Sequence, residues 1–234
     1  MPSDPDPPFG WLGERDYRVA VVTMYVAGGR SKNLLVKGDL PDFSIRCRYV
    51  PRTRPSYGAK VSWMKIRGAA PADSSEIARI NVLGWKAAAK GHIPAERMVW
   101  LDATIGERSL YWAAIASGED NDHVLVVAEK AGEVIGFVHA VPSRDPGASS
   151  DAAEISTLFV CPEHWGKGVG RALLGAALEE LRRREYSSVT LWVLDFNEWA
   201  RRFYERAAFA PDGSSKVSEF NGIPLGEVRY ERSL

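Results

Sequence analysis

The chain has 234 residues, of which 45% are hydrophobic, and its formal net charge at pH 7 is zero. This length allows one large domain or two small ones, and the apolar content is enough for a globular core. A balanced charge argues against a protein held to nucleic acid by a general basic field, so we expect no nucleic-acid partner.

Cysteine and histidine usage predicts neither a disulfide framework nor a metal site. The two cysteines are Cys47 and Cys161, and the four histidines are scattered without metal-ligand spacing. The longest apolar run, residues 19–27, is about half of what a membrane-spanning helix needs. The chain opens with acidic and proline-rich residues, unlike a signal peptide. We therefore expect a cytoplasmic protein with no metal and no membrane segment.

Residues 1–60 differ in composition from the rest of the chain. They hold seven of the fourteen prolines, and their ten Lys/Arg against six Asp/Glu give +4, which leaves −4 for residues 61–234. Residues 19–26 and 43–50 suit strands, but a breaker cluster at 51–55 follows. We predict an N-terminal extension of unknown fold at 1–60 and a main domain at 61–234.

The main domain alternates strand and helix patterns. An Asp73-Ser-Ser-Glu76 capping box predicts a helix start, and Gly91 predicts its end. The predicted order is strand, two or three helices, three strands, helix, strand, helix and two strands. The clearest predicted strands are 61–67, 123–129, 134–141, 155–160, 188–194, 216–220 and 227–231. The clearest helical segments are a turn at 94–98 and helices at 105–116 and 197–207, and a loop is predicted at 144–151. This order indicates a mixed α/β sheet.

One stretch, residues 154–178, runs from a strand through a glycine-rich turn into a helix. Backbone N–H groups converge in such a turn, and the following helix adds the positive end of its dipole, so the stretch predicts an anion site. A P-loop is excluded because Cys161 stands where its first glycine belongs. A dinucleotide fingerprint is excluded because Arg171 or Leu173 stands where its third glycine belongs.

The turn reads Trp165-Gly166-Lys167-Gly168-Val169-Gly170 and resembles the acetyl-CoA signature of the GNAT N-acetyltransferases, Gln/Arg-x-x-Gly-x-Gly/Ala. Trp165 stands where the family has Gln or Arg. A second segment, from Asn197 to Phe209, is similar to the family's late helix, with Ala208 where glycine is usual. The resemblance covers roughly residues 61–234. It implies a GNAT acyltransferase fold of the α+β type: a mixed, mostly antiparallel sheet flanked by helices.

The resemblance also implies site residues. Glu154 lies eleven residues before the signature, where the family often has the glutamate that takes the proton of the amine. Tyr204 matches the tyrosine that protonates the CoA sulfur. The backbone N–H of Leu158 lies where the family's strand splays and polarises the thioester oxygen. Two alternatives stay open: Glu154 as a carboxylate in solvent, and Tyr204 as a core aromatic.

Cofactor contacts are expected along the same stretch. The resemblance implies backbone contacts from Phe159 and Val160 to the pantetheine arm, with Asn197 reaching it from the far side. Lys167 and Arg171 add positive charge suited to a pyrophosphate. The cofactor-binding residues are thus Phe159, Val160, Trp165, Gly166, Lys167, Gly168, Val169, Gly170, Arg171 and Asn197.

The resulting hypothesis is an N-acetyltransferase that uses acetyl-CoA as acetyl donor. A primary amine of a small molecule or protein attacks directly, because no Ser/His/Asp or Cys/His arrangement points to a covalent intermediate. The alternative is a catalytically silent acyl-CoA-binding sensor or regulatory module. The acceptor amine stays open, and a homodimer formed through the closing strands is expected.

Overall fold

The computed structural model describes residues 19–26, 30–37, 63–118, 121–220 and 222–234. The chain divides into two units, of which one contains β1 (Val19–Val26) and β2 (Arg30–Lys37) and the other contains the helices and nearly all of a larger sheet. β1 and β2 pair antiparallel, from Val19↔Lys37 to Val26↔Arg30. The predicted strand at 19–26 is therefore confirmed, whereas the one at 43–50 lies outside the described residues.

The larger sheet has seven strands in the order β3-β4-β5-β6-β7-β9-β8. The strands are β3 (Lys65–Gly68), β4 (Val124–Lys130), β5 (Glu133–Pro142), β6 (Ala152–Val160), β7 (Ser188–Leu194), β8 (Ala210–Phe220) and β9 (Ile223–Ser233). The pairs β3–β4, β4–β5, β5–β6 and β7–β9 are antiparallel, while β6 and β7 are parallel. The sheet is thus mixed and mostly antiparallel, as the sequence predicts.

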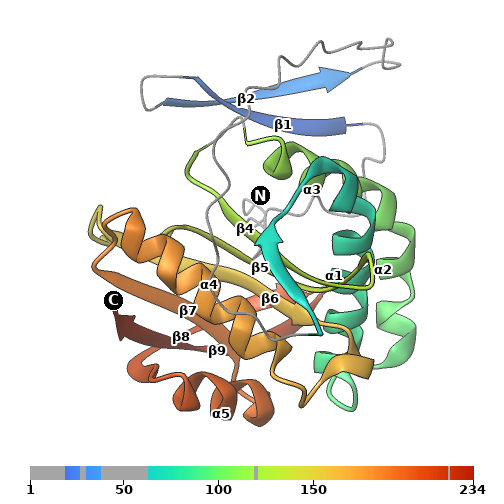
Figure 1. Cartoon of the computed structure of the whole chain (residues 1–234). Helices are drawn as coiled ribbons and strands as arrows, with labels where there is room; N and C mark the ends of the chain where they lie inside the picture. The colour runs from blue at the N-terminus through green and yellow to red at the C-terminus, as the bar shows by residue number, and fades with distance from the viewer. Residues whose placement is uncertain (1–18, 27–29, 38–62, 119–120, 221) are drawn as a thin grey trace. The chain divides into compact units, whose positions relative to one another are not determined.

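Helices cover both faces of this sheet. α1 (Ser74–Ala89), α2 (Trp100–Ala103) and α3 (Ile105–Ala116) lie on one face, and α4 (Val169–Arg183) and α5 (Glu198–Arg206) lie on the other (Figure 1). Each face has its own apolar core. Ile77 and Ile80 of α1 pack with Phe137 on the first face, and Leu173 and Leu181 of α4 lie in the core of the second.

Several predicted segments agree closely with the structure. α3 and β7 have the predicted bounds, and the helical turn predicted at 94–98 is a 3₁₀ turn at Ala95–Met98. The β4–β5 turn places Ala131 at φ 51° and Gly132 at φ 91°. Positive φ at both central residues characterises the two-residue turn that matches strand twist, so this hairpin follows from local sequence.

The predicted capping box at the start of α1 is wrong. A 3₁₀ turn, Pro71–Asp73, precedes the helix, and Asp73, although it is the N-cap residue of α1, makes no side-chain hydrogen bond to that helix. Its carboxylate instead accepts a hydrogen bond from the Ala70 N–H at 2.8 Å and pairs with Arg67 at 2.6 Å. A nearby guanidinium competes better for a carboxylate than a helix N–H does, because both partners are charged.

The closing strands are longer than predicted. β8 begins at Ala210 rather than at residue 216, and β9 begins at Ile223 rather than at 227. Pro211 lies within β8, which is the edge strand of the sheet. Proline is tolerated on an edge because its missing N–H breaks no ladder there.

Candidate active site

A gap opens in the sheet between β6 and β7. The two strands pair in parallel at three positions, Ala152↔Ser188, Ala153↔Val189 and Glu154↔Thr190. Beyond Glu154 the rest of β6 has no paired residue on the β7 side. One edge of β6 therefore presents unpaired backbone groups, which can bind an extended ligand as another strand would.

The β5–β6 register shows which peptide groups of β6 face this gap. Cys161 donates its N–H to the Ile135 carbonyl at 2.9 Å, so alternate residues back along the strand also point toward β5. Leu158 and Val160 consequently direct their N–H groups toward the gap. The Phe159 peptide faces β5 instead, and its ring lies against Gly84 of α1.

The glycine turn leads into the N-terminus of α4. Gly166 and Gly168 have φ of 71° and 85°, a left-handed backbone that other residues adopt only with strain. The first helical bond runs from the Ala172 N–H to the Gly168 carbonyl at 3.1 Å, so the N–H groups of residues 169–171 have no partner within the helix. A Cβ on Gly170 would lie 3.5 Å from the Phe203 ring, so a larger side chain would fill this space. The turn fits a phosphate group.

Trp165 is tied to the strand that precedes it. Its indole N–H donates to the Val160 carbonyl at 2.8 Å. Its ring stacks on Trp199 of α5 at 5.4 Å, and Trp199 stacks on Phe203. Trp165 and Trp199 are 41% and 62% exposed, so this stack forms an aromatic surface beside the glycine turn.

Of the two basic residues predicted at the turn, Lys167 donates to the Glu163 carbonyl at 2.8 Å. Its ammonium thus reaches back along the turn. Arg171 is exposed in the first turn of α4. Both lie within the segment that a phosphate would approach, and the flexible Lys167 side chain is free of any carboxylate partner among the described residues.

Tyr204 and Asn197 belong to α5. Tyr204 packs edge-on against Phe203 and Phe209, and burial raises the pKa of its phenol above the ordinary value. The phenol therefore stays protonated at neutral pH. Asn197 is the N-cap of α5, and its side-chain oxygen accepts a hydrogen bond from the Ala200 N–H at 3.1 Å. Its amide nitrogen is thus the group that can donate to a ligand.

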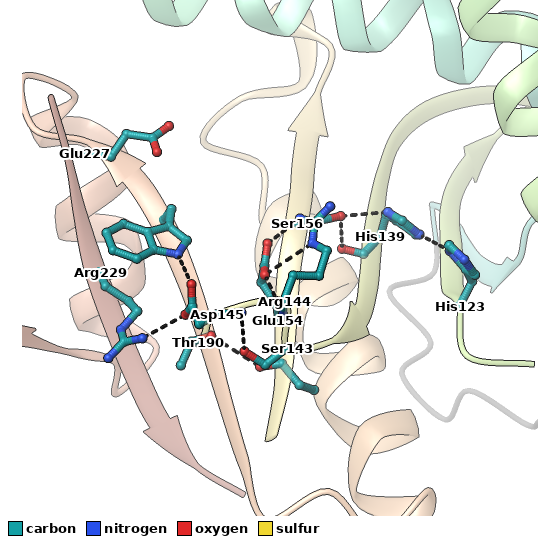
Figure 2. A network of polar contacts seen from close by, with 12 residues as sticks. His123, His139, Ser143, Arg144, Asp145, Glu154, Ser156, Thr190, Glu227 and Arg229 are labelled. Atoms are coloured by element: carbon teal, nitrogen blue, oxygen red, sulfur yellow. Dashed lines mark hydrogen bonds and ion pairs between the residues drawn. The ribbon is translucent and has the colours of Figure 1, made fainter. Parts of the chain in front are cut away.

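Glu154 lies where the gap begins and is 6% exposed. Arg144, from the loop after β5, forms a short ion pair with Oε1 and also directs its Nε and its backbone N–H to Oε2, each at 3.4 Å (Figure 2). The structure therefore places the Glu154 carboxylate in a buried position, paired with a half-exposed arginine, and not in open solvent.

A second polar cluster lies beside this pair and is formed by the loop after β5 together with β7, β8 and β9. Asp145 accepts hydrogen bonds from the Trp192 indole at 2.9 Å and from Arg229 at 2.8 Å (Figure 2). Lys216 lies over the Trp192 ring at 4.0 Å and pairs with the buried Glu227 at 3.5 Å. Charged groups of both signs thus face the same side of the sheet as Glu154.

Sequence reasoning missed Arg144, which it placed in a surface loop, and it missed a polar chain formed by His139 and Ser156. The only signal for them is strand register. Because β5 and β6 are antiparallel and Pro142 pairs with Ala153, residues just after β5 lie beside residues at the start of β6. That register is fixed by a bulge, which the sequence pattern does not reveal.

Within the described part of the chain, no group of three or more His, Cys, Asp or Glu residues is arranged to hold a metal ion. No helix among the same residues is long and apolar enough to span a membrane.

Comparison with known proteins identifies the family. The model of the acetyltransferase (GNAT) family matches residues 85–209, more than half of the chain, and the chain belongs to this family. The mycothiol acetyltransferase of Thermobispora bispora is 40% identical over 87 residues, which are 36% of this chain and 28% of that protein. N-acetyltransferase 8F1 of Mus musculus is 32% identical over 107 residues, 44% of this chain and 48% of that protein. The chain thus spans less than half of the length of these relatives.

Solved structures share the fold. The PaiA N-acetyltransferase of Thermoplasma acidophilum, in complex with coenzyme A, matches with a TM-score of 0.55 at 20% identity, over 73% of this chain and 99% of its own. The structure of YncA from Salmonella typhimurium with acetyl-CoA matches with a TM-score of 0.53 at 21% identity, over 74% and 94%. The predicted GNAT fold is confirmed.

Proposed function

We propose that this protein transfers an acetyl group from acetyl-CoA to a primary amine by direct attack. The observation that carries the proposal is the gap between β6 and β7, which begins at Glu154 and ends near the glycine turn. Acid–base groups and an anion-binding turn therefore lie at opposite ends of one unpaired strand edge. The names of the relatives and the coenzyme A complexes of structural neighbours support the same reading.

In this proposal the N-terminus of α4 holds the pyrophosphate. The N–H groups of residues 169–171 supply the hydrogen bonds, and Lys167 and Arg171 add charge. Gly166 and Gly168 give the turn its shape. The Val160 N–H and the Asn197 amide nitrogen hold the pantetheine arm, and Phe159, whose peptide faces β5, supports the strand. Acetyl-CoA supplies an activated acetyl thioester.

The reacting groups are Glu154, Leu158 and Tyr204. The Glu154 carboxylate attracts the acceptor ammonium and takes part in removing its proton. The Leu158 N–H, directed into the gap, binds the acetyl carbonyl oxygen and favours the charge that develops there. Tyr204 is protonated at neutral pH, as burial raises its pKa further above the ordinary value, and its phenol supplies the proton to the departing thiolate.

Thiol release from acetyl-CoA over a panel of primary amines tests the proposal. Glu154→Gln is expected to lower kcat/KM by about 10²-fold or more, and Tyr204→Phe to lower kcat by about tenfold or more. Glu180→Gln is the matched control, because Glu180 is also a buried carboxylate bound by arginines but lies in the last turn of α4. It should leave kcat/KM nearly unchanged.

Tight binding of coenzyme A without amine-dependent thiol release would contradict the proposal and favour a silent acyl-CoA-binding module. The homodimer through the closing strands and the cytoplasmic location remain predictions. Size-exclusion chromatography with light scattering measures the first.

A further inference from the structure

A chain of two short hydrogen bonds leads away from the candidate active site. The Ser156 hydroxyl lies 2.7 Å from Nδ1 of His139, and Nε2 of His139 lies 2.7 Å from Nδ1 of His123 (Figure 2). The three residues come from β6, from β5 and from the segment just before β4. They are far apart in sequence, so the fold itself aligns them.

Ser156 owes its position to a bulge. The β5–β6 register shifts so that His139 pairs with Thr157 and Ala140 with Ile155, which leaves Ser156 unpaired between them. A bulge of this kind re-aims a side chain, and bulges occur often beside active sites. Ser156 thereby lies on the His139 side of the sheet, two residues beyond Glu154.

The environment of His139 suits a relay. It is 2% exposed, Trp112 of α3 meets its ring edge-on at 5.3 Å, and the His123 ring stacks on it at 5.0 Å. Burial lowers its pKa well below the ordinary value, and the charges of His123 and Arg144 lower it further. A neutral imidazole has one donor and one acceptor nitrogen, so it can pass a proton from one to the other.

The outer end of the chain reaches the surface. His123 is only half-buried, and the two residues before it, Asn121 and Asp122, are exposed. The inner end lies beside Glu154, whose two carboxylate oxygens already accept hydrogen bonds from Arg144. An ammonium that approaches Glu154 therefore has to share those bonds, and the site needs a path by which the proton leaves.

We propose that the proton lost by the acceptor ammonium leaves the site through Ser156, His139 and His123. This inference rests on the proposed N-acetyltransferase function. Ser156 is the member that meets the amine, and the two histidines act through it.

One N–H bond of the ammonium breaks and an O–H bond forms at Ser156, while the original Ser156 proton moves to Nδ1 of His139. The Nε2 proton of His139 moves to Nδ1 of His123, and His123 releases its own Nε2 proton to water. One proton passes from amine to solvent and no electrons are transferred. After the product leaves, the reverse passage gives a proton to water in the emptied site and restores the starting tautomers.

The pH profile of kcat/KM tests the relay. Thiol release from acetyl-CoA is measured from pH 6 to 10 with one amine that the wild-type protein acetylates, for Ser156→Ala, His139→Gln and His123→Ala. Each variant is expected to lose about tenfold or more at pH 7. The loss should shrink once the pH exceeds the pKa of the free amine, because the amine then arrives without the proton. Added imidazole should restore part of the activity of His123→Ala.

Trp112→Phe is the matched control, since it alters the packing around His139 without removing a relay atom. If each relay variant loses the same fraction of kcat/KM at every pH, the relay is overturned and these residues have a structural role. Variants with the wild-type pH profile would overturn the relay as well. Absence of amine-dependent thiol release by the wild-type protein would overturn the proposed function and the relay together.

Discussion

The Arg144 guanidinium and the Glu154 carboxylate contact each other through both oxygens, and Glu154 is buried while the Arg144 side chain is 54% exposed. Removing the arginine leaves a buried carboxylate without its partner. We expect Arg144→Gln to lower the free energy of unfolding by about 1–3 kcal/mol, a range reduced for the exposure of the arginine. Urea denaturation measures this loss in the free energy of unfolding.

A control for this pair is Arg202→Gln. Arg202 pairs with Glu198 on the surface of α5, where both side chains are largely exposed. Exposed pairs contribute little, so this variant should be nearly as stable as the wild type. If both arginine variants lose the same stability, the Arg144–Glu154 pair contributes no more than a surface ion pair. In a double-mutant cycle of Arg144→Gln and Glu154→Gln, the double variant should lose less stability than the sum of the losses of the single variants.

Trp165→Phe removes the indole N–H that occupies the Val160 carbonyl and keeps an aromatic ring beside Trp199. The freed carbonyl can then accept a hydrogen bond from a ligand amide. We expect the affinity for coenzyme A, measured by calorimetry, to stay the same or rise up to about fivefold, the equivalent of one net hydrogen bond. A tenfold weaker affinity would show instead that the indole itself holds the ligand.

Gly168→Ala tests the shape of the turn. At φ 85° an alanine is strained even though a Cβ meets no atom within 4 Å, so we expect a loss of about 1–2 kcal/mol in the free energy of unfolding. Gly175→Ala is the control, because Gly175 lies within α4 with equal space but a helical backbone. It should raise stability by up to about 1 kcal/mol. Equal effects of the two changes would contradict the assigned backbone strain.

Gly84 and Phe159 should couple strongly. A Cβ on Gly84 would lie 2.5 Å from Cγ and 2.9 Å from Cε1 of the Phe159 ring. Gly84→Ala is therefore expected to destabilise by about 1–3 kcal/mol despite the better helix propensity of alanine. In a Phe159→Leu background the same change should become neutral or stabilising. Thermal denaturation of the four proteins decides this, and additive effects would refute the contact.

His139 should make the fold sensitive to acid. Its pKa is lowered in the folded state, so below its ordinary value of 6.5 the unfolded chain takes up a proton that the folded chain does not. Its effect on stability is absent above pH 6.5 and becomes a loss as the pH falls, by up to about 1.4 kcal/mol per pH unit. The charged or titratable groups that face it are His123 and Arg144. His139→Gln should flatten the decline of the melting temperature between pH 6.5 and 5. Parallel curves would show that His139 titrates normally.

Much of the fold could be predicted because local pattern and tertiary structure agree. The run at Ser188–Leu194 is β-branched and apolar and forms a central strand, and Gly132 allows the turn that joins β4 to β5. The start of α1 could not be predicted in detail. Asp73 has a cap pattern, but Arg67, from the preceding strand, binds its carboxylate.

The candidate site likewise has one part that could be predicted from local sequence and one part that could not. The glycine turn and Glu154 lie in one continuous stretch, so their places at the two ends of one strand edge follow from sequence spacing. Arg144 and His139 reach the site only through the β5–β6 register and the bulge at Ser156. A bulge depends on packing between strands and leaves no mark in the residue pattern, so these partners could not be placed beforehand.

The parallel pairing of β6 with β7 has a wider consequence. Only three residue pairs join these strands, so the sheet has two parts, β3 to β6 and β7 to β9, that are connected by few hydrogen bonds. Beyond these three pairs, the distance between β6 and β7 is set by the packing of α4, which connects the two strands, and not by hydrogen bonds between them. A ligand that accepts hydrogen bonds from the backbone N–H groups of Leu158 and Val160 would supply the hydrogen bonds that β6 lacks on this side. The sheet would then be continuous only in the complex.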